Sequence, residues 1–230
     1  MRQTAIRFAR SVAALFYPQQ NACHLCGRGL ASAGEGILCA RCEAELEKGR
    51  IPVAELAVGL HEPLAVCVSA YWHQDEAREL VHLLKYRSDR AAALPLGQGL
   101  CYAYASVLDD TVRRARLVVP VPLHPARRRM RGYNQALLLA REFASHTGLP
   151  VLPDALERVR ATGPQALNTR EERLRAMRGA FAAPRVDAVA GQRVLLVDDV
   201  LTTGSTAVAC AEALLSAGAR EVSLLTACRA

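Results

Sequence analysis

The run of residues 194–206, VLLVDDVLTTGST, holds the side chains of this sequence that are best suited to chemistry. Four apolar residues lead into Asp198 and Asp199, and a loop rich in hydroxyl groups follows before an alanine-rich stretch. Backbone N–H groups and hydroxyls at a helix N-terminus bind anions, and a glycine there lets the backbone approach a phosphate closely. Two carboxylates beside such a loop need another partner, which the vicinal hydroxyls of a sugar or a divalent metal supplies.

The order of buried strand, acids, loop and helix predicts a pocket for a phosphorylated pentose at the carboxyl end of the strand. In this prediction the two aspartates take the sugar. The phosphate lies on the loop, which consists of Thr202, Thr203, Gly204, Ser205 and Thr206. The alternative is a turn with helix-capping acids, and it explains each feature singly but not the four in this order.

Four of the eight cysteines form two CxxC pairs, Cys23 with Cys26 and Cys39 with Cys42. Each pair offers two thiolates from a tight knuckle, and two knuckles complete a tetrahedron, so this spacing predicts a structural Zn²⁺ site without an open catalytic position. Redox chemistry is the alternative. His24 lies inside a knuckle, from which it cannot easily reach the same ion. The remaining cysteines are scattered in apolar contexts, which argues against a secreted disulfide scaffold and predicts a cytoplasmic protein.

Hydrophobic patterns predict an alternation of strands and helices. Strands are expected over 66–72, 116–121, 193–197 and 221–226, and helices over 75–86, 91–108, 133–146 and 206–217. Such alternation implies a parallel sheet with right-handed crossovers. Breaks near residues 49–63 predict two parts: residues 1–55, with an N-terminal helix and a double zinc ribbon module, and residues 56–230, which form the α/β domain.

Charge is concentrated in the middle of the chain. The formal net charge is +7, and residues 111–180 contain fourteen arginines against five acidic residues. This excess suits a polyanionic ligand, either pyrophosphate or nucleic acid. Aromatic residues make up only 5% of the chain, which argues against a dedicated base-stacking platform for single strands. No apolar run is long enough to predict a membrane span.

Residues 194–206 closely resemble the ribose-phosphate signature of the type I phosphoribosyltransferases. That resemblance implies that Asp198 and Asp199 hold the ribose 2′- and 3′-hydroxyls, and that residues 202–206 wrap the 5-phosphate of phosphoribosyl pyrophosphate. Further stretches sharpen the likeness, namely VVPVPLH at 118–124, RRRMRGYNQA at 127–136, RVRAT at 158–162 and GAF at 179–181. Together with the four-cysteine module they resemble the ComF family of competence and DNA-utilisation proteins (ComFC/GntX-type) from Cys23 onward. The resemblance implies a type I phosphoribosyltransferase-like α/β fold, a parallel sheet flanked by helices, preceded by a small zinc ribbon.

Several arginines are candidates for binding pyrophosphate. Arg131 lies at the start of a predicted helix facing the same sheet edge. Residues 158–178 occupy the topological position of the mobile lids of phosphoribosyltransferases, which predicts lid roles for Arg160, Thr162, Gln165 and Arg173. Arg127 to Arg129 are either phosphate ligands or a solvated basic turn, and His124 is interpreted as a structural or capping residue and not a catalytic one. Ala176 stands where the family often has Asn, which puts a side-chain role there in doubt.

Two functional hypotheses follow. In the first, the chain is an enzyme that transfers a phosphoribosyl group with the help of Mg²⁺. Because the sequence ends at Ala230 without an extension to build a nucleobase pocket, the acceptor is expected to contact residues within 50–110. The candidates, which are equally explained as core residues, are Tyr71, Trp72, Lys85 and Tyr86. In the second, the chain binds a nucleotide or single-stranded DNA without catalysis. Family resemblance implies a role in DNA uptake with DNA-uptake proteins as partners.

Overall fold

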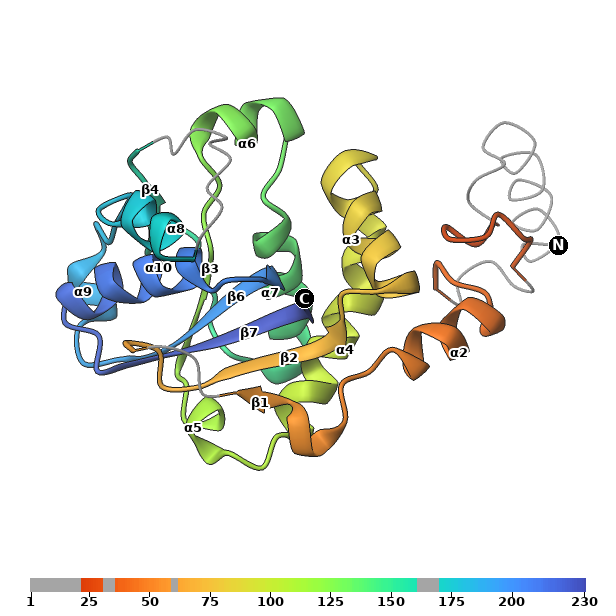
Figure 1. Cartoon of the computed structure of the whole chain (residues 1–230), viewed down its shortest axis with the longest axis horizontal. Helices are drawn as coiled ribbons and strands as arrows, with labels where there is room; N and C mark the ends of the chain where they lie inside the picture. Colours follow the sequence, from red (N-terminus) through yellow and green to blue (C-terminus); the bar gives the residue numbers. More distant parts are fainter. Residues whose placement is uncertain (1–21, 31–35, 59–61, 161–169) are drawn as a thin grey trace, which may run out of the picture.

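The fold is described from a computed structural model, which covers residues 22–30, 36–58, 62–160 and 170–230. A five-stranded sheet runs through the molecule in the order β1-β2-β7-β6-β3, and only the short β1 is antiparallel to its neighbour (Figure 1). Its strands are β1 (Ala57–Val58), β2 (Cys67–Trp72), β3 (Leu117–Pro120), β6 (Arg193–Leu201) and β7 (Glu221–Arg229). A separate two-stranded sheet pairs β4 (Glu157–Arg158) with β5 (Phe181–Ala182).

Helices cover both faces of this sheet. On one face lie α3 (Asp75–Tyr86), α4 (Ala93–Ser106) and α7 (Gln135–Thr147), and on the other lie α10 (Ser205–Ser216) and α8 (Arg170–Met177). The remaining helices are α2 (Ala40–Lys48), α5 (Asp110–Arg113), α6 (Pro125–Arg131) and α9 (Val186–Val189). Among the described helices, none has the length and apolar character that a bilayer crossing requires. The predicted α/β fold with a mostly parallel sheet is therefore confirmed.

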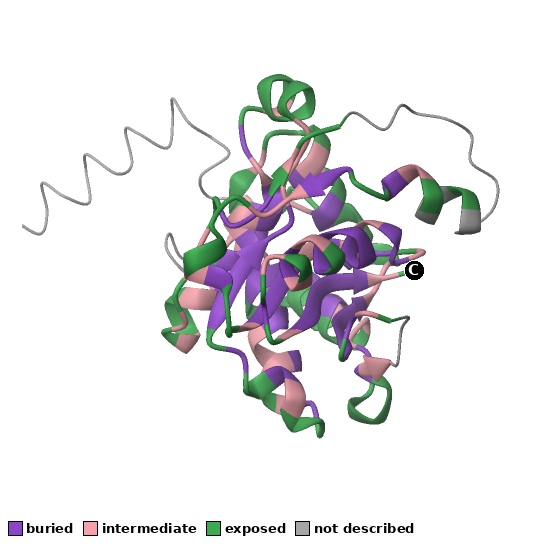
Figure 2. Cartoon of the chain, turned by 90° about the vertical axis from the view of Figure 1, so that its left-hand side faces the viewer, coloured by how far each residue is buried: buried purple, intermediate pink, exposed green. Residues whose placement is uncertain are grey.

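The strands are buried on both sides, as their unbroken apolar runs predict for a parallel sheet. Figure 2 shows the strands enclosed by the surrounding helices. Alternate residues of β6 enter two different cores: Leu195 and Val197 pack under α3, α4 and α7, whereas Val194 and Leu196 pack under α10. This period of two decides which way the following aspartates face.

One close approach fixes helix α4 on the sheet. A Cβ at Gly99 would lie 2.1 Å from a ring carbon of Tyr71, so only glycine lets the helix lie this close to β2. Tyr71 is 1% exposed and burial raises the pKa of its hydroxyl to about 12. Of the four residues considered as acceptor contacts, Tyr71 is therefore a core residue.

The connections of β3 and β6 leave the sheet on opposite faces. After β3 the chain crosses by α7 and returns beside β3 at Val151, whereas after β6 it crosses by α10 to β7. The carboxyl ends of β3 and β6 therefore flank a topological switch point, where ligands bind in open α/β sheets. The residues that follow these two strands are those the sequence marks for chemistry.

Candidate phosphoribosyl site

The two aspartates lie at the end of β6 with their side chains on opposite faces. The strand is longer than the predicted 193–197, because its pairing with β7 continues to Leu201 and Arg229. Alternation therefore turns Asp199 toward α3 and α7, and Asp198 toward the start of α10. The carbonyl of Val197 accepts the last hydrogen bond between β3 and β6, from the backbone N–H of Val121. Both aspartates follow Val197, so they lie at the carboxyl end of β6 beside the switch point.

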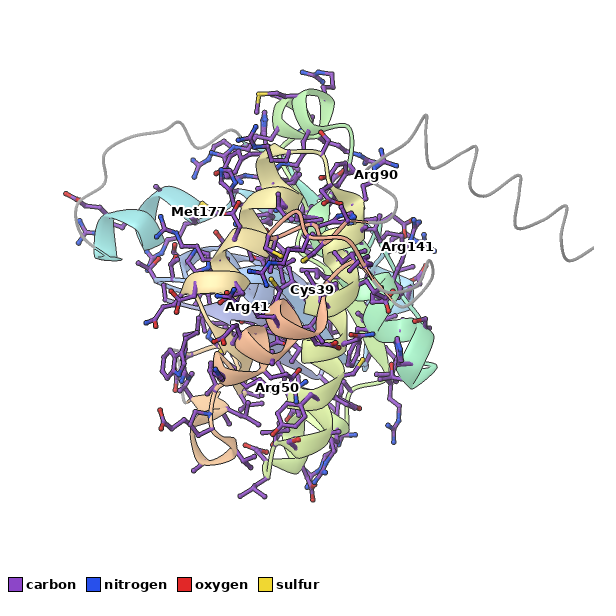
Figure 3. The ribbon with its side chains drawn as sticks, turned by 90° about the vertical axis from the view of Figure 1, so that its right-hand side faces the viewer. Cys39, Arg41, Arg50, Arg90, Arg141 and Met177 are labelled. Carbon is purple, nitrogen blue, oxygen red and sulfur yellow. The ribbon has the colours of Figure 1, made fainter. Side chains whose placement is uncertain are left out.

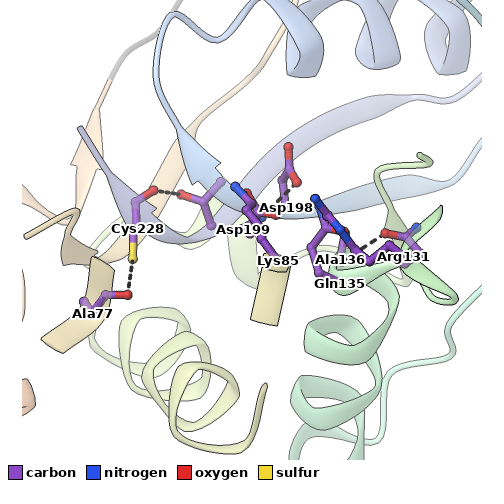
Figure 4. A network of polar contacts seen from close by, with 10 residues as sticks. Ala77, Lys85, Arg131, Gln135, Ala136, Asp198, Asp199 and Cys228 are labelled. Carbon is purple, nitrogen blue, oxygen red and sulfur yellow. Dashed lines mark hydrogen bonds and ion pairs between the residues drawn. The ribbon is translucent and has the colours of Figure 1, made fainter. Parts of the chain in front are cut away.

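Asp199 is a buried carboxylate with half of its hydrogen-bonding capacity in use. The residue is only 4% exposed, and its Oδ1 lies 2.5 Å from the Nζ of Lys85 at the end of α3 (Figure 4). Its Oδ2 is buried and has no hydrogen-bond partner among the described residues. Buried polar atoms are nearly always paired, so this oxygen marks a position for a ligand hydroxyl, a water or a cation.

Asp198 is partly buried and faces the other way. Its Oδ1 accepts a hydrogen bond of 2.8 Å from the backbone N–H of Asp199. Burial, reinforced by the nearby charge of Asp199, raises the pKa of Asp198 to about 7, and the hydrogen bond from the backbone N–H of Asp199 and the charge of Lys85 offset this rise only in part. Among the described residues one cation, Lys85, pairs with these two carboxyl groups, which favours a hydroxyl donor or a divalent cation beside them.

The loop after β6 forms a small hollow at the N-terminus of α10. Gly204 adopts a left-handed conformation with φ of 74° and begins the twelve-residue helix without a capping side chain, so the first N–H groups of α10 stay available. The hydroxyl groups of Thr203 and Ser205 form a hydrogen bond, with Oγ1 and Oγ 3.0 Å apart. The hollow is lined by Asp198, Thr202, Gly204, Ser205 and Thr206. Four of the five predicted loop residues thus surround one space with Asp198.

Arg131 and Gln135 lie near the aspartate pair, on the α6–α7 side (Figure 4). Arg131 ends α6, and its Nη1 donates a 2.5 Å hydrogen bond to Oε1 of Gln135, which is 5% exposed at the start of α7. Helix α7 packs against β6, so this pair lies on the same side of the sheet as Lys85 and Asp199 (Figure 4). His124 caps α6 by accepting from the N–H of Ala126 through its Nδ1, which confirms its expected capping role.

The lid candidates lie partly outside the described residues. Thr162 and Gln165 are not covered, and Arg173 belongs to α8 without a described side chain. Arg160 is exposed, and its Nη2 donates to the carbonyls of Ala176 and Arg178 at the end of α8. In this structure the Arg160 guanidinium therefore holds α8 at its C-terminus, and Ala176 takes part through its backbone alone.

Two residues at this edge of the sheet have contacts that the sequence pattern did not indicate. Lys85, a candidate acceptor contact in the sequence, turns its side chain inward to Asp199 instead. His73 directly follows β2 and has a buried Nδ1 without a partner in the described part of the chain. Burial, together with the charges of Lys85 and Arg78, lowers the pKa of His73. In the sequence, the position of His73 directly after a buried strand was the feature that could have marked it as a site residue. Trp72, before it, packs against the core beneath the guanidinium of Arg229.

The four cysteines of the CxxC pairs meet in one cluster. Their sulfur atoms all lie within 4.8 Å of one another, and Sγ of Cys26 lies 3.7 Å from Sγ of Cys39. Zn–S bonds of about 2.3 Å in a tetrahedron place sulfurs about 3.8 Å apart, so the cluster fits a zinc ion. His24 instead pairs with Asp89 at 2.5 Å, as expected for a residue outside the ligand set.

The cysteine cluster is seated on the α/β domain. Cys39 is labelled in Figure 3, where its module lies over α3 and α4. Leu46 of α2 is part of the same core as β2, and Leu25 and Ile37 pack against that core. The His24–Asp89 pair adds a polar contact just beyond the end of α3. A metal bound here would therefore brace the same helix that carries Lys85.

Comparisons with known proteins agree with this geometry. Residues 135–230 match the phosphoribosyl transferase domain family, which places β6, the aspartate pair and α10 inside a phosphoribosyl transferase domain. The chain is thus a phosphoribosyltransferase-domain protein with a four-cysteine cluster in front of the domain.

Relatives give the family. The DNA utilization protein YhgH of Escherichia coli strain K12 is 30% identical over 209 residues, 90% of this chain and 89% of the relative. The YhgH protein of Salmonella typhimurium is 38% identical over 154 residues, covering 65% of this chain and 66% of the relative. Competence protein F of Haemophilus influenzae is 35% identical over 114 residues, 49% of this chain and half of that protein. The chain belongs to the ComF family, which includes these DNA utilization and competence proteins.

Proposed function

We propose that this protein binds a phosphoribosyl pyrophosphate-like ligand at the crevice between β3 and β6 and acts in the use of DNA taken up by the cell. The ribose hydroxyls bind to Asp198 and Asp199, and the 5-phosphate occupies the hollow at the start of α10. The observation that carries the proposal is Oδ2 of Asp199, a buried carboxylate oxygen without a partner among the described residues, beside an anion-binding helix start.

A divalent cation such as Mg²⁺ fits the same edge of the sheet. Among the described residues, Lys85 is the only cation that forms an ion pair with either aspartate, and hard cations prefer carboxylate and phosphate oxygens. When bound with the ligand, such a cation would offset the charge of the pyrophosphate. Arg131 is proposed to bind the pyrophosphate from the end of α6. The lid residues Arg160, before α8, and Arg173, within α8, are proposed to bind it as well.

Zinc is the proposed resident metal of the cysteine cluster, with a structural role. All eight cysteines are free thiols in the structure, which suits the reducing cytoplasm proposed for this protein. The division into residues 1–55 and 56–230 is part of the same proposal: the first part carries the metal, and the second binds the phosphorylated sugar.

Single-stranded DNA is a second candidate ligand, supported by helix α6. Arg127, Arg128 and Arg129 are exposed there, and no ion pair between described residues involves them. Arg128 and Arg129 also line a hollow between α6 and β4. Such a surface binds the phosphate backbone, so we expect DNA affinity to fall steeply with salt. DNA binding that hardly changes between low and high salt would contradict this candidate.

One assay separates an enzyme from a binding protein. The full chain is incubated with phosphoribosyl pyrophosphate, Mg²⁺ and a panel of nucleobases and amines, and released pyrophosphate is measured alongside ligand binding. Release that depends on an acceptor identifies a phosphoribosyltransferase, and binding without release identifies a nucleotide-binding protein. Absence of both binding and release would contradict the proposed function.

A further inference from the structure

The pair formed by His24 and Asp89 joins the cysteine module to the end of helix α3. Nδ1 of His24 lies 2.5 Å from Oδ2 of Asp89, and because a carboxylate only accepts hydrogen bonds, the imidazole is the donor. Among the described residues, no other side-chain hydrogen bond or ion pair links residues 22–48 to the α/β domain. The side chains are 26% and 19% exposed, so water has limited access to the contact. The pair therefore fixes the module to one point of the domain.

Asp89 holds the chain just after α3 in a strained conformation. Its other oxygen, Oδ1, accepts a 3.1 Å hydrogen bond from the backbone N–H of Ala91, and its own N–H donates to the carbonyl of Leu83 at 3.3 Å. Ser88, the residue before it, has a φ of 56°, which is unfavourable for a residue with a Cβ. Such a conformation persists where surrounding contacts enforce it, and the bonds of Asp89 are contacts of this kind.

The space around this pair is not filled by side chains. A hollow lies there, lined by Gly27 of the cysteine module and by Leu83 and Arg87 at the end of α3. Close packing would hold two parts of a protein together without a hydrogen bond, whereas across a hollow their relative position depends on the polar contact. Loss of the bond between His24 and Asp89 is therefore expected to release the end of α3.

The same end of α3 carries the contact with the aspartate pair. Nζ of Lys85, in the last turn of the helix, lies 2.5 Å from Oδ1 of Asp199. The carbonyl of Leu83 accepts from the N–H of Arg87 as well as from that of Asp89, so a shift of residues 87–89 moves the turn that contains Lys85. Because the energy of an ion pair depends on the distance between its charges, such a shift changes how Lys85 neutralises Asp199.

We infer that His24 and Asp89 are positioning residues of the phosphoribosyl site, and that they act through Lys85. Their bond fixes the last turn of α3, which sets the ammonium group of Lys85 against Oδ1 of Asp199 and leaves Oδ2 available to the ligand. The cysteine module thereby supports ligand affinity without touching the ligand. This inference rests on the proposed function, because the series of contacts ends at the aspartate pair that binds the sugar.

The test removes the bond from the side of the α/β domain. Asp89→Ser keeps a side chain that caps the following turn but is too short to reach His24. Binding of phosphoribosyl pyrophosphate to the full chain is measured by calorimetry with Mg²⁺ present, and zinc per chain is measured by elemental analysis. We expect Asp89→Ser to weaken binding at least about threefold, within the range for residues that couple distant sites, and to retain its zinc.

Two further variants separate positioning from general damage. His24→Asn places an amide N–H donor as many bonds from the backbone as Nδ1, so it should retain the ligand affinity of the unaltered chain. His146→Ala is the matched control, because His146 also faces a carboxylate, that of Glu142 at 3.7 Å, but belongs to α7. Since exposed pairs of this kind contribute little, its affinity should stay within about twofold of that of the unaltered chain.

A comparison without ligand tests the route through Lys85. Urea unfolding is measured for Asp89→Ser, Lys85→Met and the double variant. We expect the double variant to lose less unfolding free energy than the sum of the two single losses, because residues of one network are not additive. Additive losses, unchanged ligand affinity in Asp89→Ser, or loss of its zinc would each overturn the inference and leave the proposed function in place. Failure of the unaltered chain to bind phosphoribosyl pyrophosphate would overturn both.

Discussion

Replacing Lys85 by Met removes the cation that pairs with the buried Asp199 in the described part of the chain. The side chain of Asp199 is 6% exposed and that of Lys85 is 21% exposed, so water reaches the ammonium group but hardly the carboxylate. Breaking a fully buried pair by removing one partner costs about 3–5 kcal/mol. Because Lys85 is partly hydrated, we expect the loss of unfolding free energy to fall at or just below the lower end, about 2–3 kcal/mol.

The measurement is urea unfolding of the full chain at pH 8. Lys48→Met is the matched control, since Lys48 is the other lysine of the sequence and pairs with Glu45 across exposed surface, with side-chain exposures of 70% and 41%. Such exposed pairs contribute little, so this variant should unfold with the unaltered chain. The double variant Lys85→Met/Asp199→Asn removes both charges and should recover most of the loss.

The loss caused by Lys85→Met should shrink at lower pH. Lys85 lowers the pKa of Asp198, so its removal raises that pKa further and a proton then replaces the missing positive charge. If Lys85→Met destabilises no more than Lys48→Met, or if its effect is the same at pH 5 and pH 8, then the pair is not the buried, charge-compensating contact described above.

Three further predictions concern the loop, the titration of Asp198 and the metal. Gly204→Ala should lower the unfolding free energy by about 1–2 kcal/mol, because a φ of 74° strains an L-residue, and it should also weaken phosphoribosyl pyrophosphate binding. The control is Gly148→Ala, with φ of 71° at the end of α7, which should lose stability but keep its ligand affinity. Equal ligand affinity in both variants would contradict the role of the loop. Since the pKa of Asp198 is raised in the folded state from 3.8 to about 7, the native state binds more protons over that window, and unfolding free energy from this group falls as pH rises through it. Asp198→Asn should therefore be more stable than the unaltered chain at pH 8 in thermal unfolding, and a destabilised variant would refute the sign. Cys42→Ala should lose stoichiometric zinc by elemental analysis and melt at lower temperature, whereas Cys101→Ala should keep one zinc per chain; unaltered chain purified without zinc would contradict the site.

Local patterns predicted the elements of this fold well where periodicity was strong. Helix α3 has the predicted bounds, because its apolar spacing and acidic first turn agree with each other. Strand β6 exceeded its prediction by four residues because the apolar run stops at Val197. Polar residues do not end a strand whose backbone still pairs with a neighbour, and the pairing of β6 with β7 continues through both aspartates to Leu201.

Contacts between distant segments could not be read from the sequence. Lys85 and Asp199 are 114 residues apart, and their meeting depends on how α3 packs over β6. The pairing of Arg131 with Gln135, by contrast, joins residues four apart across the turn between α6 and α7, which begins at the left-handed Gly132. The cysteine cluster was predictable because its spacing alone suffices to bring four thiols to one ion.

The central claim, that the aspartate pair binds a phosphorylated pentose, is tested most directly by calorimetric titration of the full chain with phosphoribosyl pyrophosphate and Mg²⁺. Asp198→Asn and Asp199→Asn should each weaken binding about ten- to hundredfold, because hydrogen bonds to charged groups contribute about 1.5–3 kcal/mol. Asp187→Asn, at an exposed position of α9, should bind as the unaltered chain does. Affinity within twofold of the unaltered chain in both aspartate-pair variants would contradict the claim.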